Sequence, residues 1–223
     1  MTKDIQLFNG DCLDIMDKLI ADCVKVDAII TDPPYGISYQ SCWKSDKEKR
    51  FPKILNDKKP FTEFIKKLKG ILKERYSLHI FTRWDVQQEF INCLEKNNFK
   101  CKNVIIWDKK IHGMGDLNTA YGSRYESIIF SSSRNFRFNQ KRPTDIIDCV
   151  RVPATKLMHP NEKPIKLIEN LIQQAVPENG CVLDLFMGSG STGLACKNLN
   201  RNFIGIELDP IYFKIAKDRI EKV

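Results

Sequence analysis

Short apolar runs separated by polar or turn-forming residues recur along the chain and predict buried strands. These runs are Ile5–Phe8, Val26–Thr31, Ser77–Phe81, Val104–Trp107, Glu126–Phe130, Cys181–Phe186 and Asn202–Glu207. Between them, apolar residues return every three or four positions, which is typical of helices with one buried face. The helices are expected at Leu13–Ile20, Phe61–Leu72, Val86–Lys96, Pro164–Gln174, Thr192–Asn198 and Pro210–Ile220. Alternating strands and helices predict an α/β sandwich with a mainly parallel sheet.

Local signals support two of the helix starts and two of the connections. Asp85 precedes the helix expected from Val86, and Asp209 is followed by Pro210 in a first helical turn. A carboxylate just before a helix caps its free N–H groups, and proline is well tolerated at the first helical position. The connections 36–60 and 109–123 are long enough to be functional loops.

The composition describes a single globular domain, 1–223, with 42% hydrophobic and 29% charged residues. No apolar run approaches the length of a membrane span. The segment Met1–Gly10 lacks the features of a signal peptide, so we expect a cytoplasmic protein. The eight cysteines contain no C-x-x-C pair and the three histidines are scattered, so we expect reduced thiols and no metal.

Positive charge is concentrated in the middle of the chain. Residues 1–40 carry 3 basic and 7 acidic side chains, a net charge of −4, whereas residues 41–75 carry 12 and 5, a net +7. The net charge is +2 over 76–125 and +3 over 126–158, and it balances over 159–223. A solvated lysine-rich surface would explain part of this excess. Aromatic residues among the charges favour a polyanionic partner.

An acid, two prolines and an aromatic residue follow the apolar run Val26–Thr31. They are Asp32, Pro33, Pro34 and Tyr35. Proline has no backbone N–H and fixes its own φ, so the strand must end here. The sequence therefore places a carboxylate and an aromatic ring rigidly at the mouth of a sheet.

A glycine-rich turn follows the last but one strand and leads into a helix near Thr192. Gly188 and Gly190 allow the backbone to approach a ligand, and the helix N-terminus offers free N–H groups. Glu207 ends the next strand, where an acid can accept hydrogen bonds from ribose hydroxyls. A capping or surface role is the alternative for Glu207. The pattern G-S-G-S-T-G differs from the dinucleotide fingerprint G-x-G-x-x-G, which counts against a dinucleotide cofactor.

Together the two motifs resemble those of the DNA amino-methyltransferases, in the β group whose Asp-Pro-Pro-Tyr motif precedes its Phe-x-Gly-x-Gly motif. Further stretches match the family in the same order, namely Asn9–Leu13, Trp107–Lys109, Gly113–Gly115, Arg124–Glu126 and His159–Pro164. Two positions depart from the family: Leu185 stands in place of proline, and Ser191 in place of a frequent threonine. Neither departure removes a charge or a glycine.

The resemblance implies chemistry at the exocyclic amine of a base. The Asp32 carboxylate and the Pro33 carbonyl would accept hydrogen bonds from the two amine N–H groups. Pro34 would help fix the direction of that carbonyl, and Tyr35 would stack on the base. Position and preorganised dipoles would supply most of the rate. A duplex base would have to be flipped out to reach such a site.

The resemblance also implies S-adenosylmethionine as the cofactor. Its contacts are expected from Asp11, Lys163, Asp184, Phe186, Gly188, Ser189, Gly190, Thr192 and Glu207. Asp11 would bind the adenine amino group and Glu207 the ribose, while Asp184, Phe186 and the glycines would surround the methionine part. Simpler roles are open for three of them: Asp11 can cap a helix, Lys163 can be solvated, and Phe186 can belong to the core.

The fold implied is a circularly permuted sandwich with a seven-stranded, mostly parallel sheet and one antiparallel strand near Val104–Phe130. Asn202–Glu207 would lie beside Ile5–Phe8. The segment between Phe130 and His159 is too short for a separate recognition domain, so the loops 36–60, 109–123 and 131–158 would read the target. The residues expected on double-stranded DNA are Arg50, Lys53, Arg137, Lys141 and Arg142.

Asp32 in the first motif position favours N6 of adenine as the methyl acceptor in the family. The alternatives are N4 of cytosine, an RNA base, a protein glutamine, or a non-catalytic DNA-binding module. Enzymes acting on glutamine or RNA usually begin the motif with Asn and place the glycine-rich motif first, so the order here opposes them. A homodimer and a restriction endonuclease are candidate partners in this family.

Overall fold

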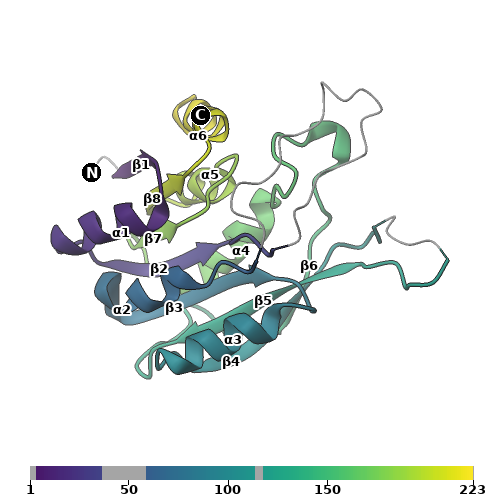
Figure 1. The fold of residues 1–223 in the computed structure, drawn as a ribbon, viewed down its shortest axis with the longest axis horizontal. Coiled ribbons are helices and arrows are strands. Elements are labelled where there is room, and N and C mark those ends of the chain that lie inside the picture. The colour runs from purple at the N-terminus through teal and green to yellow at the C-terminus, as the bar shows by residue number, and fades with distance from the viewer. Residues whose placement is uncertain (1–3, 37–58, 114–117, 223) are drawn as a thin grey trace.

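The computed structural model describes residues 4–36, 59–113 and 118–222, and they form one sheet covered on both faces by helices (Figure 1). The sheet has eight strands in the order β1-β8-β7-β2-β3-β5-β4-β6. The strands are β1 (Ile5–Asn9), β2 (Val26–Thr31), β3 (Leu72–Thr82), β4 (Cys101–Asp108), β5 (Tyr125–Ser132), β6 (Ile146–Asp148), β7 (Cys181–Asp184) and β8 (Asn202–Glu207). Only β5 runs antiparallel to its neighbours, β3 and β4.

The mostly parallel sheet and its single antiparallel strand confirm the predicted fold class. The predicted count of seven strands was wrong by one, because β6 adds a short edge strand beside β4. With three residues, β6 is too short to show an apolar pattern. The neighbourhood of the first and last strands is confirmed, since Ile5 pairs with Phe203 and Asn9 with Glu207 in parallel register.

Two groups of helices bury the two faces of the sheet (Figure 1). One group contains α1 (Cys12–Ala21), a 3-10 helix η2 (Glu63–Lys67), α2 (Leu68–Ile71) and α3 (Gln87–Lys96). The other contains α4 (Ile165–Ala175), α5 (Ser191–Asn198) and α6 (Pro210–Glu221). A second 3-10 helix, η3 (Ala154–Lys156), precedes α4. In the part of the chain that the structure describes, no helix combines the length and apolarity needed to cross a membrane.

The helix predicted at Phe61–Leu72 was wrong in its length and its end. It is replaced by η2 and the short α2, and Leu72 already begins β3. Gly70 packs so closely on α1 that a Cβ there would lie 2.8 Å from Ile20 Cδ1. Leu72 is buried and pairs with Val26, so sheet pairing overrides the helical spacing of the preceding residues.

The two predicted caps have different outcomes. Asp209 caps α6, because its Oδ1 accepts hydrogen bonds from the N–H groups of Ile211 and Tyr212 at 2.8 and 3.3 Å. Asp85 does not cap α3. Its carboxylate instead accepts from the Arg83 guanidinium at 2.8 and 3.1 Å, and the cap position of α3 is Val86, without a side-chain bond.

Candidate active site

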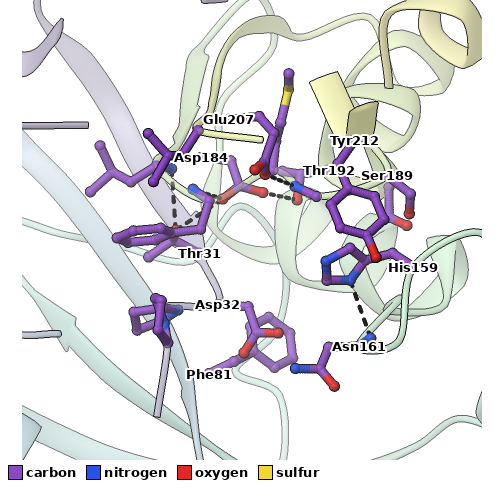
Figure 2. Close-up of a pocket in the computed structure, with 18 of the residues that line it drawn as sticks. Thr31, Asp32, Phe81, His159, Asn161, Asp184, Ser189, Thr192, Glu207 and Tyr212 are labelled. Carbon is purple, nitrogen blue, oxygen red and sulfur yellow. Dashed lines mark hydrogen bonds between the residues drawn. The ribbon is translucent and has the colours of Figure 1, made fainter. Parts of the chain in front are cut away.

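A pocket opens at the carboxyl edge of the sheet, where β1, β2, β7 and β8 all end (Figure 2). Such an edge is where ligands bind in open parallel sheets. Its lining includes Asp11, Thr31, Asp32, Pro33, Pro34, Tyr35, His159, Lys163, Asp184, Phe186, Gly188, Ser189, Thr192, Glu207 and Tyr212. The structure therefore brings the Asp-Pro-Pro-Tyr stretch and the glycine-rich turn to one cavity.

Asp184 joins these two motifs by hydrogen bonds. Its Oδ1 accepts from the Thr31 hydroxyl at 2.9 Å and from the Phe186 N–H at 3.2 Å, and its Oδ2 accepts from the Thr192 hydroxyl at 2.6 Å. Burial raises the pKa of Asp184 to about 6, although these hydrogen bonds oppose the rise. Asp184 thus holds the glycine-rich turn against the end of β2.

The glycine-rich turn is shaped by two left-handed residues, and only one of them lines the pocket. Gly188 has φ +52° and donates its N–H to Glu207 Oε2 at 2.8 Å. Gly190 has φ +80°, and a Cβ there would lie 3.0–3.1 Å from Ala216 and Ile220 of α6. Gly190 therefore serves the packing of α6 on the turn, which differs from the cofactor contact expected for it.

Glu207 lies at the end of β8 with its carboxylate in the pocket. Its two oxygens accept backbone hydrogen bonds: Oε2 from the N–H of Gly188, and Oε1 from the N–H of Asp209 at 2.9 Å. Burial raises the pKa of Glu207, and these two backbone bonds oppose the rise. The backbone thereby fixes the direction of the carboxylate, and each oxygen keeps capacity for a further hydrogen bond.

Asp11 and Phe186 each line the pocket and have a structural role as well. Asp11 caps α1, since its Oδ1 accepts from the N–H of Leu13 at 2.7 Å. The Phe186 ring lies edge-on to Phe61 and Phe64, with centroids 5.7 Å away in both cases. The simpler roles predicted for these residues are therefore present in the structure.

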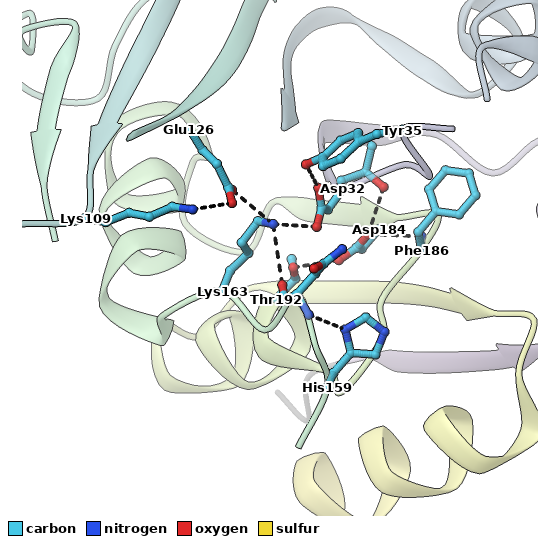
Figure 3. A network of polar contacts seen from close by, with 11 residues as sticks. Asp32, Tyr35, Lys109, Glu126, His159, Lys163, Asp184, Phe186 and Thr192 are labelled. Carbon is cyan, nitrogen blue, oxygen red and sulfur yellow. Dashed lines mark hydrogen bonds and ion pairs between the residues drawn. The ribbon is translucent and has the colours of Figure 1, made fainter. Parts of the chain in front are cut away.

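Asp32 lies on the other side of the pocket, between a phenol and an ammonium group (Figure 3). The Tyr35 hydroxyl donates to Asp32 Oδ1, and Lys163 Nζ donates to Oδ2 at 2.5 Å. Burial raises the pKa of Asp32, and the charge of Lys163 opposes the rise. Burial and the Asp32 charge raise the pKa of Tyr35 well above its usual value.

Lys163 lines the pocket, and its ammonium group is paired there with two carboxylates. Its Nζ lies between Asp32 and Glu126, at 2.5 and 3.2 Å, and its side chain is only 8% exposed. Solvation, the simpler alternative, is excluded by this burial. Glu126 was part of a recognised stretch but had no role assigned, because sequence gives no sign that β5 carries it to Asp32.

The sequence reasoning also missed His159 and Tyr212, which form one wall of the pocket (Figure 2). Their ring centroids lie 4.3 Å apart with the rings edge-on. Burial and the nearby Lys163 lower the pKa of His159 to about 3, so the imidazole is neutral. The Tyr212 hydroxyl is buried without a hydrogen-bond partner among the described residues. A polar atom of this kind points to a ligand.

The cations expected on DNA are not gathered at the pocket. Arg50 and Lys53 lie outside the described residues. Arg137 follows β5, which is antiparallel and therefore ends on the side of the sheet where the parallel strands begin, away from the pocket. Its backbone carbonyl accepts a hydrogen bond from Arg75 Nη2 at 2.8 Å. Lys141 and Arg142 are exposed on the way from that side of the sheet to β6. No group of side chains in residues 4–36, 59–113 and 118–222 is arranged to hold a metal ion.

Comparison with known proteins extends over nearly the whole chain. The DNA adenine methyltransferase YhdJ of Escherichia coli is 28% identical over 96% of this chain and 82% of its own length. The Type II methyltransferase M1.MboII of Moraxella bovis is 29% identical over 92% of each chain.

Solved structures share the fold as well. The M1.HpyAVI–SAM complex superposes with a TM-score of 0.79 and 30% identity, covering 97% of this chain and 98% of that one. The cytosine-N4-specific PvuII DNA methyltransferase has a TM-score of 0.71 at 13% identity, over 98% and 87% of the chains, and so shares the fold alone. A family model described as DNA methylase matches residues 26–218, and the protein thus belongs to the N6/N4 DNA methylase family.

Proposed function

We propose that this protein transfers a methyl group from S-adenosylmethionine to N6 of an adenine flipped out of duplex DNA. The observation that carries the proposal is the half-buried Asp32 carboxylate, which shares one pocket with the glycine-rich turn and Glu207. S-adenosylmethionine supplies an electrophilic methyl group with a good leaving group. The residues of this chain have to hold that group and a flat amine in line with each other.

The cofactor half of the pocket has polar groups suited to a nucleoside and an amino acid. Glu207 offers a fixed carboxylate for ribose hydroxyls, and Asp11 offers a second acceptor on the neighbouring strand end. The Tyr212 hydroxyl, which has no hydrogen-bond partner among the described residues, and Ser189 also line the cavity and offer further polar groups for the methionine part. The fit rests on these donors and acceptors together.

The substrate half is suited to an exocyclic amine. Such an amine is a weak nucleophile, because its lone pair is conjugated into the ring. Hydrogen bonds from its two N–H groups to Asp32 and to the Pro33 carbonyl favour a more tetrahedral nitrogen. The Tyr35 hydroxyl donates to Asp32 Oδ1, and this oxygen keeps capacity for a further hydrogen bond from an incoming amine. Asp32 is also the nearest carboxylate to receive the amine proton after attack.

Adenine is favoured over cytosine on two grounds. Asp in the first motif position goes mostly with adenine N6 in the resembling family, and YhdJ, a relative over most of this chain, is named as an adenine methyltransferase. N4 of cytosine is the second candidate, since the PvuII enzyme shares the fold. Relatives named Type II methyltransferases extend the proposal to a role beside a restriction endonuclease.

The DNA face is proposed at the carboxyl edge around the pocket. Exposed apolar side chains lie next to strand ends at this edge, at Trp84 after β3, Ile111 after β4, and Tyr121 and Tyr125 at the start of β5. The described parts of the connection between β4 and β5 project beyond the sheet here (Figure 1), and they include Lys110, Tyr121 and Arg124. Aromatic rings and cations together suit a nucleic acid with an unstacked base.

The deciding experiment is methylation of duplexes of varied sequence with labelled S-adenosylmethionine, followed by digestion and mass spectrometry. N6-methyladenine is the expected product. N4-methylcytosine would replace the adenine assignment with the second candidate. Label in protein or RNA alone would contradict the proposal, and cofactor binding without transfer to any duplex would indicate the non-catalytic module.

A further inference from the structure

Four charged side chains of alternating sign form a chain from the pocket outward (Figure 3). Asp32 pairs with Lys163 at 2.5 Å, Lys163 with Glu126 at 3.2 Å, and Glu126 with Lys109 at 2.7 Å. They come from four places in the fold: the end of β2, the segment before α4, β5 and the end of β4. The two positive and two negative charges balance.

The ion pairs of this chain are largely shielded from solvent, so the loss of one partner is costly. The Lys163 side chain is 8% exposed and its Nζ also lies 5.0 Å from the centroid of the Phe81 ring. Glu126 and Asp32 are 19% and 17% exposed. Removing one member of a buried ion pair leaves the other charge without compensation, which is strongly unfavourable.

We propose that Lys163, held in place by Glu126, is a positioning residue that keeps the Asp32 carboxylate charged and oriented toward the amine of the target base. This inference rests on the proposed function and adds to it two residues with a role apart from cofactor binding. Lys163 donates to Oδ2 of Asp32 and the Tyr35 hydroxyl donates to Oδ1, so the carboxylate is held in one orientation from both sides.

The surroundings of Asp32 explain why a cation is needed there. The charged groups near Asp32 are the carboxylates of Glu126 and Asp184, which repel its negative charge, and the Tyr35 hydroxyl donates a hydrogen bond to it. The positive charge of Arg83, which follows β3, interacts with Tyr35. Lys163 is the cation that contacts Asp32 directly. Without Lys163, two buried carboxylates would share one cavity, and one of them would take up a proton. A protonated Asp32 is a poorer acceptor for the amine.

The test uses charge deletions that keep side-chain size. Lys163→Met removes the cation, Glu126→Gln removes its second partner, and Lys166→Met is the control, because Lys166 is exposed three residues further along. Turnover with the best methyl-accepting duplex, the apparent KM for DNA, the Kd for S-adenosylmethionine and the pH profile are measured for each. Wild-type product analysis is done first, so the base that is methylated is known independently.

Lys163→Met is expected to lower kcat by on the order of 100-fold, since misplacement of a positioned group costs that much. The Kd for S-adenosylmethionine should stay within about 3-fold of wild type, because the Lys163 ammonium group contacts Asp32 and Glu126, which are assigned to the base and not to the cofactor. The acidic limb of the pH–rate profile of Lys163→Met should move to higher pH. Adding Glu126→Gln should return the limb toward the wild-type position and recover part of the turnover, which a merely structural role of Lys163 would not produce. Lys166→Met should match wild type.

A second measurement needs no turnover. With ¹³C-labelled aspartate, and Asp32→Asn to assign the signal, the titration midpoint of Asp32 should rise by about one pH unit or more in Lys163→Met. An unchanged midpoint, turnover within about 3-fold of wild type, or a tenfold weaker cofactor Kd with unchanged kcat would each overturn the proposal. If the wild-type product is N4-methylcytosine, the adenine assignment is overturned. The role of Lys163 is then decided by the same comparison of kcat, cofactor Kd and Asp32 midpoint between Lys163→Met and wild type.

Discussion

The Thr31 hydroxyl lies 2.9 Å from Asp184 Oδ1, although 153 positions separate the two residues in sequence. The same hydroxyl accepts the N–H of Leu185 at 3.2 Å. Thr31 precedes Asp32 directly, and Asp184 begins the glycine-rich turn. This contact therefore fixes the Asp-Pro-Pro-Tyr stretch relative to the glycine-rich turn.

Thr31→Val is expected to destabilise the protein by about 1–3 kcal/mol, because it leaves a buried carboxylate and a buried N–H with one partner fewer. Urea unfolding measures the change. Thr144→Val is the matched control, since the Thr144 hydroxyl makes its bond to the Ile146 carbonyl in an exposed position. Equal unfolding free energies for the two variants would contradict a coupling role of Thr31.

Asp184 should make stability depend on pH in a particular direction. Its pKa is raised from 3.8 in the unfolded chain to about 6, so the folded state binds the proton more tightly. Its contribution is therefore favourable below pH 4 and is lost as pH rises through 6, at about 1.4 kcal/mol per unit. Between pH 4 and 7, the free energy of unfolding of the wild type should thus fall by about 3 kcal/mol relative to that of Asp184→Asn, as measured by urea unfolding. A difference that is flat with pH would mean that Asp184 titrates normally.

Asp32→Asn should reduce methyl transfer to the limit of detection while S-adenosylmethionine still binds. The amide keeps the size of the side chain but loses the charge that Lys163 pairs with and presents a donor toward the amine. Calorimetry of cofactor binding and label incorporation into DNA measure the two effects separately. Turnover near the wild-type level would remove Asp32 from the mechanism.

Tyr212→Phe isolates the unpartnered hydroxyl. Deleting it should weaken S-adenosylmethionine binding by about 0.5–1.5 kcal/mol, the usual net value of one hydrogen bond. The unfolding free energy of the cofactor-free protein should not fall, because no partner in the described chain is lost. An unchanged cofactor Kd would show that the hydroxyl does not contact the ligand.

Substitutions at Tyr121 and Arg137 are expected to have different effects on the affinity for duplex DNA. Tyr121 is fully exposed on the projecting connection, so Tyr121→Ala should weaken duplex binding by about 1–3 kcal/mol if it stacks on a base. Arg137→Ala should leave affinity and its salt dependence unchanged, because Arg137 lies at the far edge of the sheet. Titrations across a salt series compare them. Loss of affinity in Arg137→Ala alone would place DNA on the other edge.

Residues in short motifs could be placed from sequence, because a motif fixes local backbone geometry. Asp32 and Gly188 were expected in one site and line one pocket. The contacts of Lys163 could not be predicted, since they join the segment before α4 to the end of β2 and to β5, which only the tertiary fold brings together. The short α2 was missed for a similar reason, because pairing of Leu72 with Val26 decides where β3 begins.

The pairing of β1 with β8 has a consequence for synthesis of the protein. β1 lies at one margin of the sheet and has β8 as its only neighbour there. A nascent chain leaving the ribosome must therefore keep its first strand unpaired until residues 202–207 emerge. Closing so long a loop is slow, and an unpaired strand edge is prone to association in the meantime. Asp11 and Glu207 are brought together only at that last step, so the part of the pocket that they line forms late in folding.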